Sequence, residues 1–389
     1  MGNMKINKVY LKRIYIDNFR TLVNFELKLD HLTLLLGDNG AGKTTVFDVL
    51  RRLREFVSGR MRVDEAFAHT NLTRWQMQPI QRFELDFEIN KQTYSYKLEV
   101  ESNPEIRKSR VIHEVVSLDS KPLLNFTDGF VQLYNDKFND GPRFPMDWTI
   151  SGLSIVSDRN DNRKLTAFRK QMEKLIVVSL IPQQISSISR EEQNQLVSTG
   201  ENFPSWWRVM SQERPDLIAE SFDQLRKVFS NLRLAWLKDD GGNSRKLTLR
   251  FSPPPEDENL IAPFSETEQS DVEYTFDELS DGQRVLFILY TLVIGLKGQG
   301  YLLFLDEPEN FVSLPEIQPW LMLLSDTVSN GLDQACIISH HPEQINYLGA
   351  EHGIWIVRSS GGPSRIVKPS FKGDKHLSLS EAVARGWTS

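Results

Sequence analysis

The order of apolar and polar positions predicts a sheet in the first third of the chain. Residues 11–37 contain three short apolar or alternating segments separated by turn residues, which is typical of β-strands. Residues 82–89 and 93–100 alternate around Asn90, Lys91 and Gln92, and this pattern predicts a hairpin. Residues 111–126 continue in the same way. We therefore expect an antiparallel sheet here.

The middle of the chain has a different texture. Residues 127–162 are rich in Asp, Asn, Gly and Pro without a sustained period, which predicts a loop. Residues 163–181 and 203–237 have helical spacing but no sustained heptads, so we expect helices and no long coiled coil. Residues 252–269 form a proline-rich, acidic connector. The bulky apolar residues of the second helical stretch are expected to be core rather than base-stacking platforms: Trp206, Trp207, Met210, Leu217, Phe222, Leu225 and Phe229.

The last third again predicts buried strands. Residues 301–305 and 335–339 are apolar runs that end in polar residues and follow helical segments, as parallel strands do. Both halves of the chain should therefore contribute strands to one mixed sheet of an α/β fold. We expect an N-terminal lobe (1–126), a loop-rich and helical lobe (127–270) and a C-terminal lobe (271–389).

Composition places the chain among ordinary globular proteins. It has 389 residues, 40% of them hydrophobic, and a formal net charge of -6, which argues against a surface that is basic throughout. No long apolar run or signal peptide is present, so we expect a cytoplasmic protein without membrane contact. The single cysteine, Cys336, lies in an apolar run and should be buried.

Two basic clusters leave an alternative open. Each could be a solvated helix face or part of a positive groove that binds DNA. The clusters are Arg51, Arg52, Arg54, Arg60 and Arg62, and then Arg163, Lys164, Arg169, Lys170 and Lys174.

Residues 37–44 (GDNGAGKT) complete the phosphate-loop pattern between an apolar run and a helix-compatible stretch. Gly37 and Gly42 allow the backbone to turn so that successive N–H groups face phosphates. Lys43 can reach the β- and γ-phosphate oxygens, and the Thr44 hydroxyl can bind Mg²⁺. The predicted nucleotide-binding residues here are Gly37, Asp38, Asn39, Gly40, Ala41, Gly42, Lys43, Thr44 and Thr45.

Two carboxylates follow the apolar run at 301–305. Asp306 at the tip of a buried strand fits a residue that holds Mg²⁺ through its water shell. The adjacent Glu307 is then the expected general base for the attacking water. Strand ends are often acidic, so the interpretation depends on the phosphate loop that precedes them.

Residues 279–284 (LSDGQR) precede a strongly apolar helix. Ser280 and Gly282 at a helix N-terminus can donate hydroxyl and backbone N–H groups to an anion. The alternative is a helix cap formed by Ser280 or Asp281, with Gln283 in the first turn.

With ISHHPE near residue 340, these segments resemble the nucleotide-binding head of ABC-type ATPases, in the branch of RecF, SMC and OLD proteins. The resemblance rests on three segments: IDNFRTL at residues 16–22, LSDGQR and LDEPEN. It covers residues 1–50 and 270–360 closely. It implies an α/β fold of the ABC-type P-loop NTPase head, with a mixed central sheet, an antiparallel β subdomain and a helical lobe.

The resemblance also implies site residues and a dimer. Two heads would sandwich two ATP molecules, so that Ser280 and Gly282 act on the nucleotide of the other subunit. Gln283 is a further expected nucleotide-binding residue. His340, rather than His341, would contact the γ-phosphate. Asp281 departs from the glycine of transporters, and the glutamine that couples the lobes is open between Gln183 and Gln184.

The implied activity is ATP hydrolysis with Mg²⁺ that controls a separate effector, such as a Toprim-like nuclease, as in bacterial anti-phage defence. No nuclease activity of the chain itself is expected. The alternatives are a RecF-like repair ATPase that binds DNA and, less favoured by the Asn-Phe-Arg opening, the ATPase subunit of a transporter.

Overall fold

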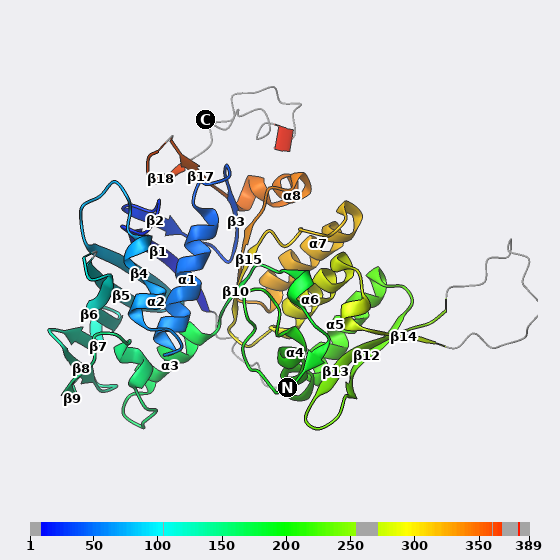
Figure 1. Cartoon of the computed structure of the whole chain (residues 1–389), viewed down its shortest axis with the longest axis horizontal. Coiled ribbons are helices and arrows are strands. Elements are labelled where there is room, and N and C mark those ends of the chain that lie inside the picture. Colours follow the sequence, from blue (N-terminus) through cyan, green and yellow to red (C-terminus); the bar gives the residue numbers. More distant parts are fainter. Residues whose placement is uncertain (1–8, 104, 254–270, 360, 368–379, 382–389) are drawn as a thin grey trace, which may run out of the picture. The chain divides into compact units, whose positions relative to one another are not determined.

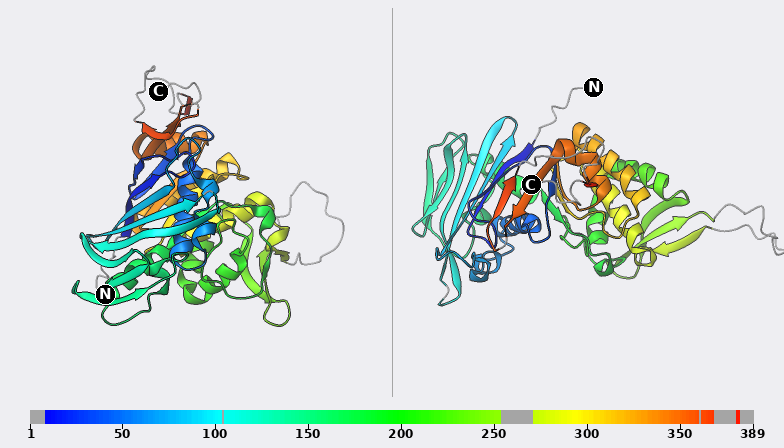
Figure 2. Two further views of the ribbon diagram at one scale, coloured as in Figure 1. Left: turned by 60° about the vertical axis from the view of Figure 1, so that its left-hand side comes forward. Right: turned by 90° about the horizontal axis from the view of Figure 1, so that it is seen from above.

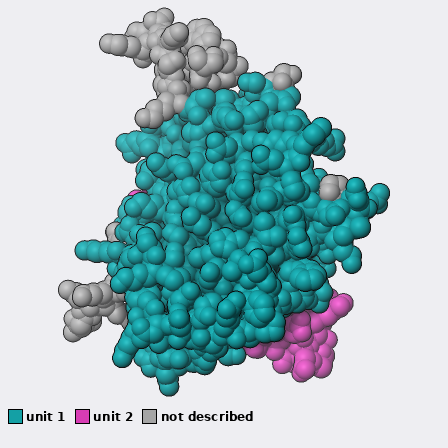
Figure 3. Space-filling model, turned by 90° about the vertical axis from the view of Figure 1, so that its left-hand side faces the viewer, with its two compact units in different colours: residues 1–177, 298–307, 328–389 teal, residues 178–297, 308–327 magenta. Residues whose placement is uncertain are grey.

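A computed structural model describes residues 9–103, 105–253, 271–359, 361–367 and 380–381. The chain divides into two compact units, coloured in Figure 3. Unit 1 comprises residues 1–177, 298–307 and 328–389, and unit 2 comprises residues 178–297 and 308–327. The division into three lobes expected from the sequence stays a prediction.

Unit 1 contains an antiparallel sheet of eight strands in the order β2-β1-β4-β5-β6-β7-β8-β9 (Figures 1 and 2). Strands β1, β2, β4 and β5, with the hairpin around Asn90 and Lys91, confirm the expected antiparallel sheet. The strands are β1 (Val9–Asp17), β2 (Phe25–Lys28), β4 (Ile80–Ile89), β5 (Gln92–Asn103), β6 (Lys108–Leu118), β7 (Lys121–Thr127), β8 (Phe130–Tyr134) and β9 (Asp140–Pro145).

A second sheet of unit 1 has six strands in the order β10-β15-β16-β3-β17-β18. Strands β15, β16, β3 and β17 run parallel, and β18 closes the edge antiparallel to β17. Both halves of the chain therefore contribute to one mixed sheet, as predicted. The strands are β3 (Leu32–Leu36), β10 (Leu175–Val178), β15 (Leu302–Asp306), β16 (Gln334–Ile338), β17 (Gly353–Arg358) and β18 (Ser364–Val367).

The two sheets of unit 1 share a hydrophobic core with helix α1 (Lys43–Val57). Phe47 of α1 packs edge-on against Phe304 of β15, with ring centroids 5.4 Å apart. The Gln334 side chain joins the sheets, because it accepts a hydrogen bond from Leu11 N and donates one to Leu11 O, each 2.9 Å long. Cys336 is fully buried, as expected. Unit 1 also contains helices α2 (Val63–Ala66), α3 (Arg163–Glu173) and α8 (Pro342–His352) and the 3-10 turns η1 (His69–Asn71) and η2 (Gly152–Ile155).

Two sequence predictions in unit 1 are wrong in part. Residues 127–162 contain β8 and β9 instead of only loop, because Asp128 and Gly129 have positive φ and turn β7 back into β8. The helix predicted over 163–181 ends at Glu173, and the run Leu175–Val178 is the buried strand β10.

Unit 2 packs helices against an antiparallel sheet. Its sheet has the order β11-β13-β12, with β14 also paired to β13. The elements are η3 (Pro182–Gln184), β11 (Ile188–Ser189), α4 (Phe203–Glu213), α5 (Pro215–Val228), β12 (Leu232–Asp239), β13 (Arg245–Phe251), β14 (Val272–Thr275), η4 (Phe276–Glu278), α6 (Asp281–Gly295) and most of α7 (Leu314–Asn330).

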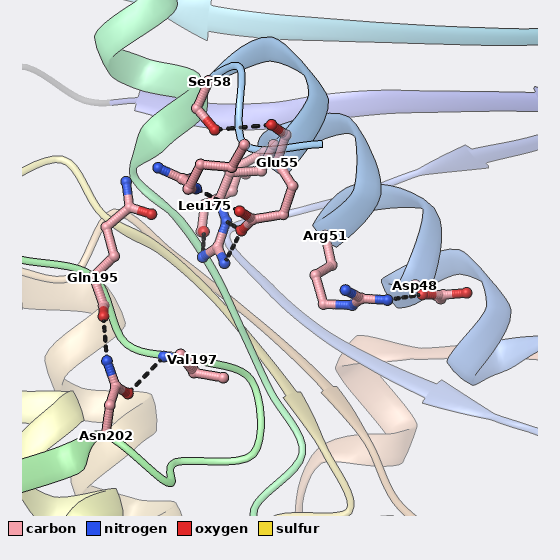
Figure 4. Close-up of polar contacts among 10 residues, drawn as sticks. Asp48, Arg51, Glu55, Ser58, Leu175, Gln195, Val197 and Asn202 are labelled. Carbon is pink, nitrogen blue, oxygen red and sulfur yellow. Dashed lines mark hydrogen bonds and ion pairs between the residues drawn. The ribbon is translucent and has the colours of Figure 1, made fainter. Parts of the chain in front are cut away.

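The helical stretch predicted at 203–237 is divided in the structure. Pro215 starts a second helix, and β12 replaces the predicted helix from Leu232 onward. Trp206 and Trp207 are buried, which agrees with the core interpretation. The loop before α4 is tied by Asn202, which accepts a hydrogen bond from Val197 N and donates one to Gln195 O, each 2.8 Å long (Figure 4).

The helix lengths bear on two expectations from the sequence, one about a long coiled coil and one about membrane contact. The longest helix in the described ranges is α7, with 17 residues. Within those ranges, no helix combines the length and apolar character needed to cross a bilayer. The predicted connector at 252–269 lies, from residue 254 onward, outside the described residues.

Candidate nucleotide site

The carboxyl ends of three adjacent strands bring the predicted unit 1 residues together. Ile338 of β16 is paired with both Asp306 of β15 and Leu35 of β3. The phosphate loop, Asp306, Glu307 and His340 therefore leave the sheet at the same edge. This is the edge at which open α/β sheets bind ligands.

The loop between β3 and α1 needs its glycines for geometric reasons. Gly37 has φ 139°, and a Cβ atom there would lie 1.9 Å from the carbonyl oxygen of Ile356. Gly42 precedes α1 with φ 104°, a conformation in which a side chain is strained. The loop thus presents the N-terminus of a fifteen-residue helix, where backbone N–H groups favour anions.

Lys43 lies inside this loop. Its Nζ donates hydrogen bonds to the carbonyl oxygens of Gly37 at 2.6 Å and Asp38 at 3.0 Å. Burial lowers the pKa of Lys43, whereas the nearby carboxylates of Glu307 and Asp306 raise it. The ammonium group is thereby held at the loop by backbone carbonyls, where it can transfer to phosphate oxygens.

Thr44 and Asp306 are close enough to share a cation. The Thr44 hydroxyl lies 3.4 Å from Asp306 Oδ1. A hydroxyl and a carboxylate are hard oxygen donors, and Mg²⁺ keeps several waters when only a few protein oxygens bind it. These two side chains therefore fit the Mg²⁺ that a bound triphosphate carries.

Glu307 and His340 form the other polar pair at this edge. Glu307 has a positive φ of 48°, and its N–H donates to Ile338 O at 2.9 Å, which continues the pairing of β15 with β16. His340 Nε2 lies 3.7 Å from Glu307 Oε1. Burial, with a further contribution from Lys43, lowers the pKa of His340 below 6.5, although Glu307 opposes the shift. Burial therefore favours the neutral form of the imidazole.

The residues Ser280, Gly282 and Gln283 lie in unit 2, at the start of α6. Ser280 caps the helix: its hydroxyl oxygen accepts from Gln283 N at 3.2 Å, and Gln283 Oε1 accepts from Ser280 N at 3.0 Å. Because the hydroxyl accepts in this cap, its own hydrogen can still be donated. The cap and the anion-binding interpretations are therefore compatible.

Sequence reasoning missed residues beside the phosphate loop. A cavity of about 160 Å³ is lined by Asp38, Asn39, Gly40 and Ala41 together with Arg358, Ser359 and Gly361 from the end of β17 and the turn after it. Arg358 Nε donates to Gly362 O at 2.8 Å. The only signal in the sequence was the Ser-Ser-Gly-Gly turn after an apolar run, which does not indicate its neighbour in space.

The first basic cluster is engaged in ion pairs along α1. Asp48 accepts from Arg51 at 2.6 Å (Figure 4). It also accepts from Arg52 at 2.9 Å and pairs with Arg20. Asp48 and Glu55 thus balance part of the cluster's charge. The second cluster is similarly paired, since Arg169 and Lys170 both contact Asp158. These ion pairs involve only part of each cluster, and the DNA-binding alternative stays a prediction.

Comparison with known proteins identifies the fold and one domain. Residues 4–126 match the AAA ATPase domain family. The SMC head bound to the C-winged helix domain of ScpA aligns with a TM-score of 0.55 and 13% identity, over 96% of this chain and 99% of that one. The SMC head of Pyrococcus yayanosii, with a coiled coil and joint, aligns with a TM-score of 0.51 and 9% identity, over 98% and 100% of the two chains.

No curated protein matches the chain in sequence. The matches that do exist agree with the geometry of the phosphate loop and with the mixed sheet that carries it. Residues 4–126 thus match the AAA ATPase domain family, and the chain as a whole has the fold of SMC head domains.

Proposed function

We propose that the protein binds and hydrolyses ATP at the carboxyl edge of the parallel strands. The observation that carries this proposal is that Thr44 meets Asp306 and His340 meets Glu307 at the edge where the phosphate loop begins. The loop N–H groups and Lys43 bind the β- and γ-phosphates. Mg²⁺, held by Thr44 and Asp306, neutralises phosphate charge when it is bound.

The acid and base roles follow from the same geometry. Glu307 accepts a proton from the attacking water, and the neutral imidazole of His340 donates a hydrogen bond to a γ-phosphate oxygen. Their separation of 3.7 Å allows both side chains to face one reacting group.

We further propose that two copies sandwich two ATP molecules, with Ser280, Gly282 and Gln283 of one copy completing the site of the other. The resemblance to the RecF, SMC and OLD branch supports this arrangement. A similar SMC head is bound to a domain of ScpA, which supports control of a separate partner protein here. An effector in anti-phage defence, a cytoplasmic location and the lack of intrinsic nuclease activity remain parts of the proposal.

The test is the substitution Glu307→Gln. It removes the base but keeps a side chain of the same size, so ATP affinity should change little while kcat falls by about a hundredfold or more. The variant should accumulate as an ATP-bound dimer, measured by light scattering. Glu351→Gln is the matched control, because Glu351 is 86% exposed and also lies beside a histidine, 3.9 Å from His352.

The result shows whether Glu307 acts as the general base or only ends strand β15. Unchanged hydrolysis by the Glu307→Gln protein would remove Glu307 from the mechanism. Equal losses in both variants would assign the effect to the loss of any surface carboxylate, and the proposed role would fail.

A further inference from the structure

Three side chains form a polar network at the start of α6. Asp281 accepts a hydrogen bond from Gln183 Nε2 at 2.5 Å on one carboxylate oxygen. Its other oxygen pairs with the guanidinium of Arg284, one turn further along the helix. Both oxygens of Asp281 are therefore bonded, although the side chain keeps 34% of its exposure.

Arg284 extends this network into the turn η3. Its Nη1 donates to Pro182 O at 2.6 Å and to Ile185 O at 3.2 Å, at the two ends of η3. The side chain is only 11% exposed. A planar guanidinium can serve several acceptors at once, so Arg284 joins the helix start to η3 more rigidly than a single hydrogen bond would.

The backbone near Phe311 supports the same turn through Gly282. A Cβ atom at Gly282 would lie 2.6 Å from Phe311 O. Phe311 itself has a positive φ of 72°, which is rare for a bulky residue. Ser280 and Gly282 are thus located by contacts with two separate segments, η3 and the backbone at Phe311.

The network also weakens the effect of the negative charge of Asp281, which lies between Ser280 and Gly282 in the sequence. A carboxylate at residue 281 would repel an anion facing Ser280 and Gly282. Hydrogen bonds from Gln183 and Arg284 spread this charge over a partly buried ion pair. The repulsion between the Asp281 carboxylate and an anion at Ser280 and Gly282 is therefore reduced.

We propose that Gln183, Asp281 and Arg284 are positioning residues, which hold Ser280 and Gly282 in the orientation that contacts the ATP bound by a second copy of this chain. The inference rests on the proposed function, because it assigns a task to the same composite site. It also selects Gln183 over Gln184 as the glutamine that contacts the Ser280 turn.

The primary test compares Asp281→Ala and Gln183→Ala with the parental protein. Each should leave the Kd of the isolated subunit for ATP unchanged, because the phosphate loop is intact. The kcat of ATP hydrolysis should fall roughly tenfold or more in Asp281→Ala, and less in Gln183→Ala, which loses one hydrogen bond. Asp281→Glu keeps the charge and should recover part of kcat.

A matched control is available on α5. Asp223 and Arg226 have the same chemistry and spacing as Asp281 and Arg284, but they lie on the surface, with exposures of 71% and 48%. Asp223→Ala should leave kcat unchanged. The midpoint of thermal unfolding is measured for all variants, so that a loss of fold is recognised.

Mixed dimers assign the defect to one half of the composite site. Asp281→Ala mixed with Lys43→Ala should regain activity. One site of the mixed dimer then combines the intact phosphate loop of the Asp281→Ala subunit with the intact start of α6 of the Lys43→Ala subunit. Asp281→Ala mixed with Ser280→Arg should not regain it. A purely structural defect would reduce ATP affinity and unfolding temperature together, and mixing would not restore activity.

The outcomes distinguish the positioning role of Gln183, Asp281 and Arg284 from the proposed composite ATP site on which it rests. If Ser280→Arg abolishes hydrolysis while Asp281→Ala retains the parental kcat, the positioning network is refuted and the composite site stands. If Ser280→Arg is itself fully active, the composite site fails and the inference fails with it.

Discussion

At the scale of single residues, the site depends on backbone conformations that its neighbours impose. Gly37 is required by the carbonyl of Ile356, whatever ligand the loop binds. Glu307 turns away from β15 with a positive φ, yet its N–H still bonds to β16. The side chains that leave this edge are therefore oriented before any nucleotide arrives, and preorganised groups act without the cost of reorganisation.

Gly37→Ala should remove ATP binding and destabilise unit 1. The added Cβ would meet Ile356 O at 1.9 Å, so the loop or β17 must move, and we expect a loss of about 3 kcal/mol or more. Gly40→Ala is the control, since φ is 79° there but no atom lies within 4 Å, and it should cost about 1 kcal/mol. Chemical denaturation and ATP titration of both variants measure the difference. Equal losses in the two would contradict the steric explanation.

The pH dependence of kcat/KM should report His340. Burial lowers the pKa of His340 in the nucleotide-free protein, so the neutral form is retained to lower pH than in an ordinary histidine. We expect kcat/KM to be constant near neutral pH and to decline in acidic solution, at a lower pH than an ordinary histidine would give. The folded state also loses stability as the pH falls through this range, because folding disfavours the charged imidazole.

Two variants check the assignment. His340→Gln should have lower activity and lack the acidic decline, since an amide does not titrate. His341→Gln should keep the parental profile. An acidic decline that is preserved in His340→Gln would assign the titration to another group.

At the scale of elements, the sequence predicted strands that a local pattern determines, but it missed strands that depend on neighbours in space or on a turn signal that was not recognised. The strands β1 to β3, the β4–β5 hairpin and the parallel pair β15 and β16 are confirmed, because alternation or a short apolar run determines them locally. Strand β10 was missed because four apolar residues after a helix extend its pattern, and only its place beside β15 makes them a strand. Strand β8 was missed although Asp128 and Gly129 form a hairpin turn signal.

The site shows the same limit. The phosphate loop and the pair Asp306 and Glu307 could be named from sequence because each is a local motif at a strand end. Arg358 and the contact between Gln183 and Asp281 could not, since their partners are separated by hundreds of residues or by a whole subdomain. Spacing along the chain contains no information about such pairs.

The anchoring of α1 leads to a prediction about stability. Arg54 is 4% exposed, and it donates to Leu175 O at 2.8 Å and to Glu55 at 2.6 Å, which joins α1 to β10. Arg54→Ala should therefore cost about 3–5 kcal/mol in the free energy of unfolding, as expected when a buried ion pair is broken. Arg60 also pairs with Glu55 but is 40% exposed, so Arg60→Ala should cost less than about 1 kcal/mol. Urea denaturation of the two variants tests whether burial sets the difference, and similar losses would contradict it.

At the scale of the whole molecule, the two groups of predicted site residues belong to different compact units. Unit 1 contains the phosphate loop, Asp306, Glu307 and His340, whereas unit 2 contains Ser280, Gly282 and Gln283. Unit 2 is interrupted in sequence by residues 298–307, so β15 enters unit 1 between α6 and α7. If each ATP needs unit 1 of one copy and unit 2 of another, hydrolysis per subunit must rise with protein concentration.

Mixing two inactive variants tests this requirement most directly. Lys43→Ala removes the cation of the phosphate loop, and Ser280→Arg blocks the start of α6, so neither homodimer should hydrolyse ATP. In a mixed dimer, one composite site combines the intact Lys43 of one subunit with the intact Ser280 of the other, while the second site carries both defects. At equal amounts, random pairing makes half of the dimers mixed, and each has one of two sites intact, so activity should approach about a quarter of the parental value if the sites act independently. The ATPase rate is measured while one variant is titrated into the other at constant total protein. A rate that stays at zero at every ratio, under conditions in which light scattering shows ATP-dependent dimers, would refute the composite site and would return the catalytic groups to a single subunit.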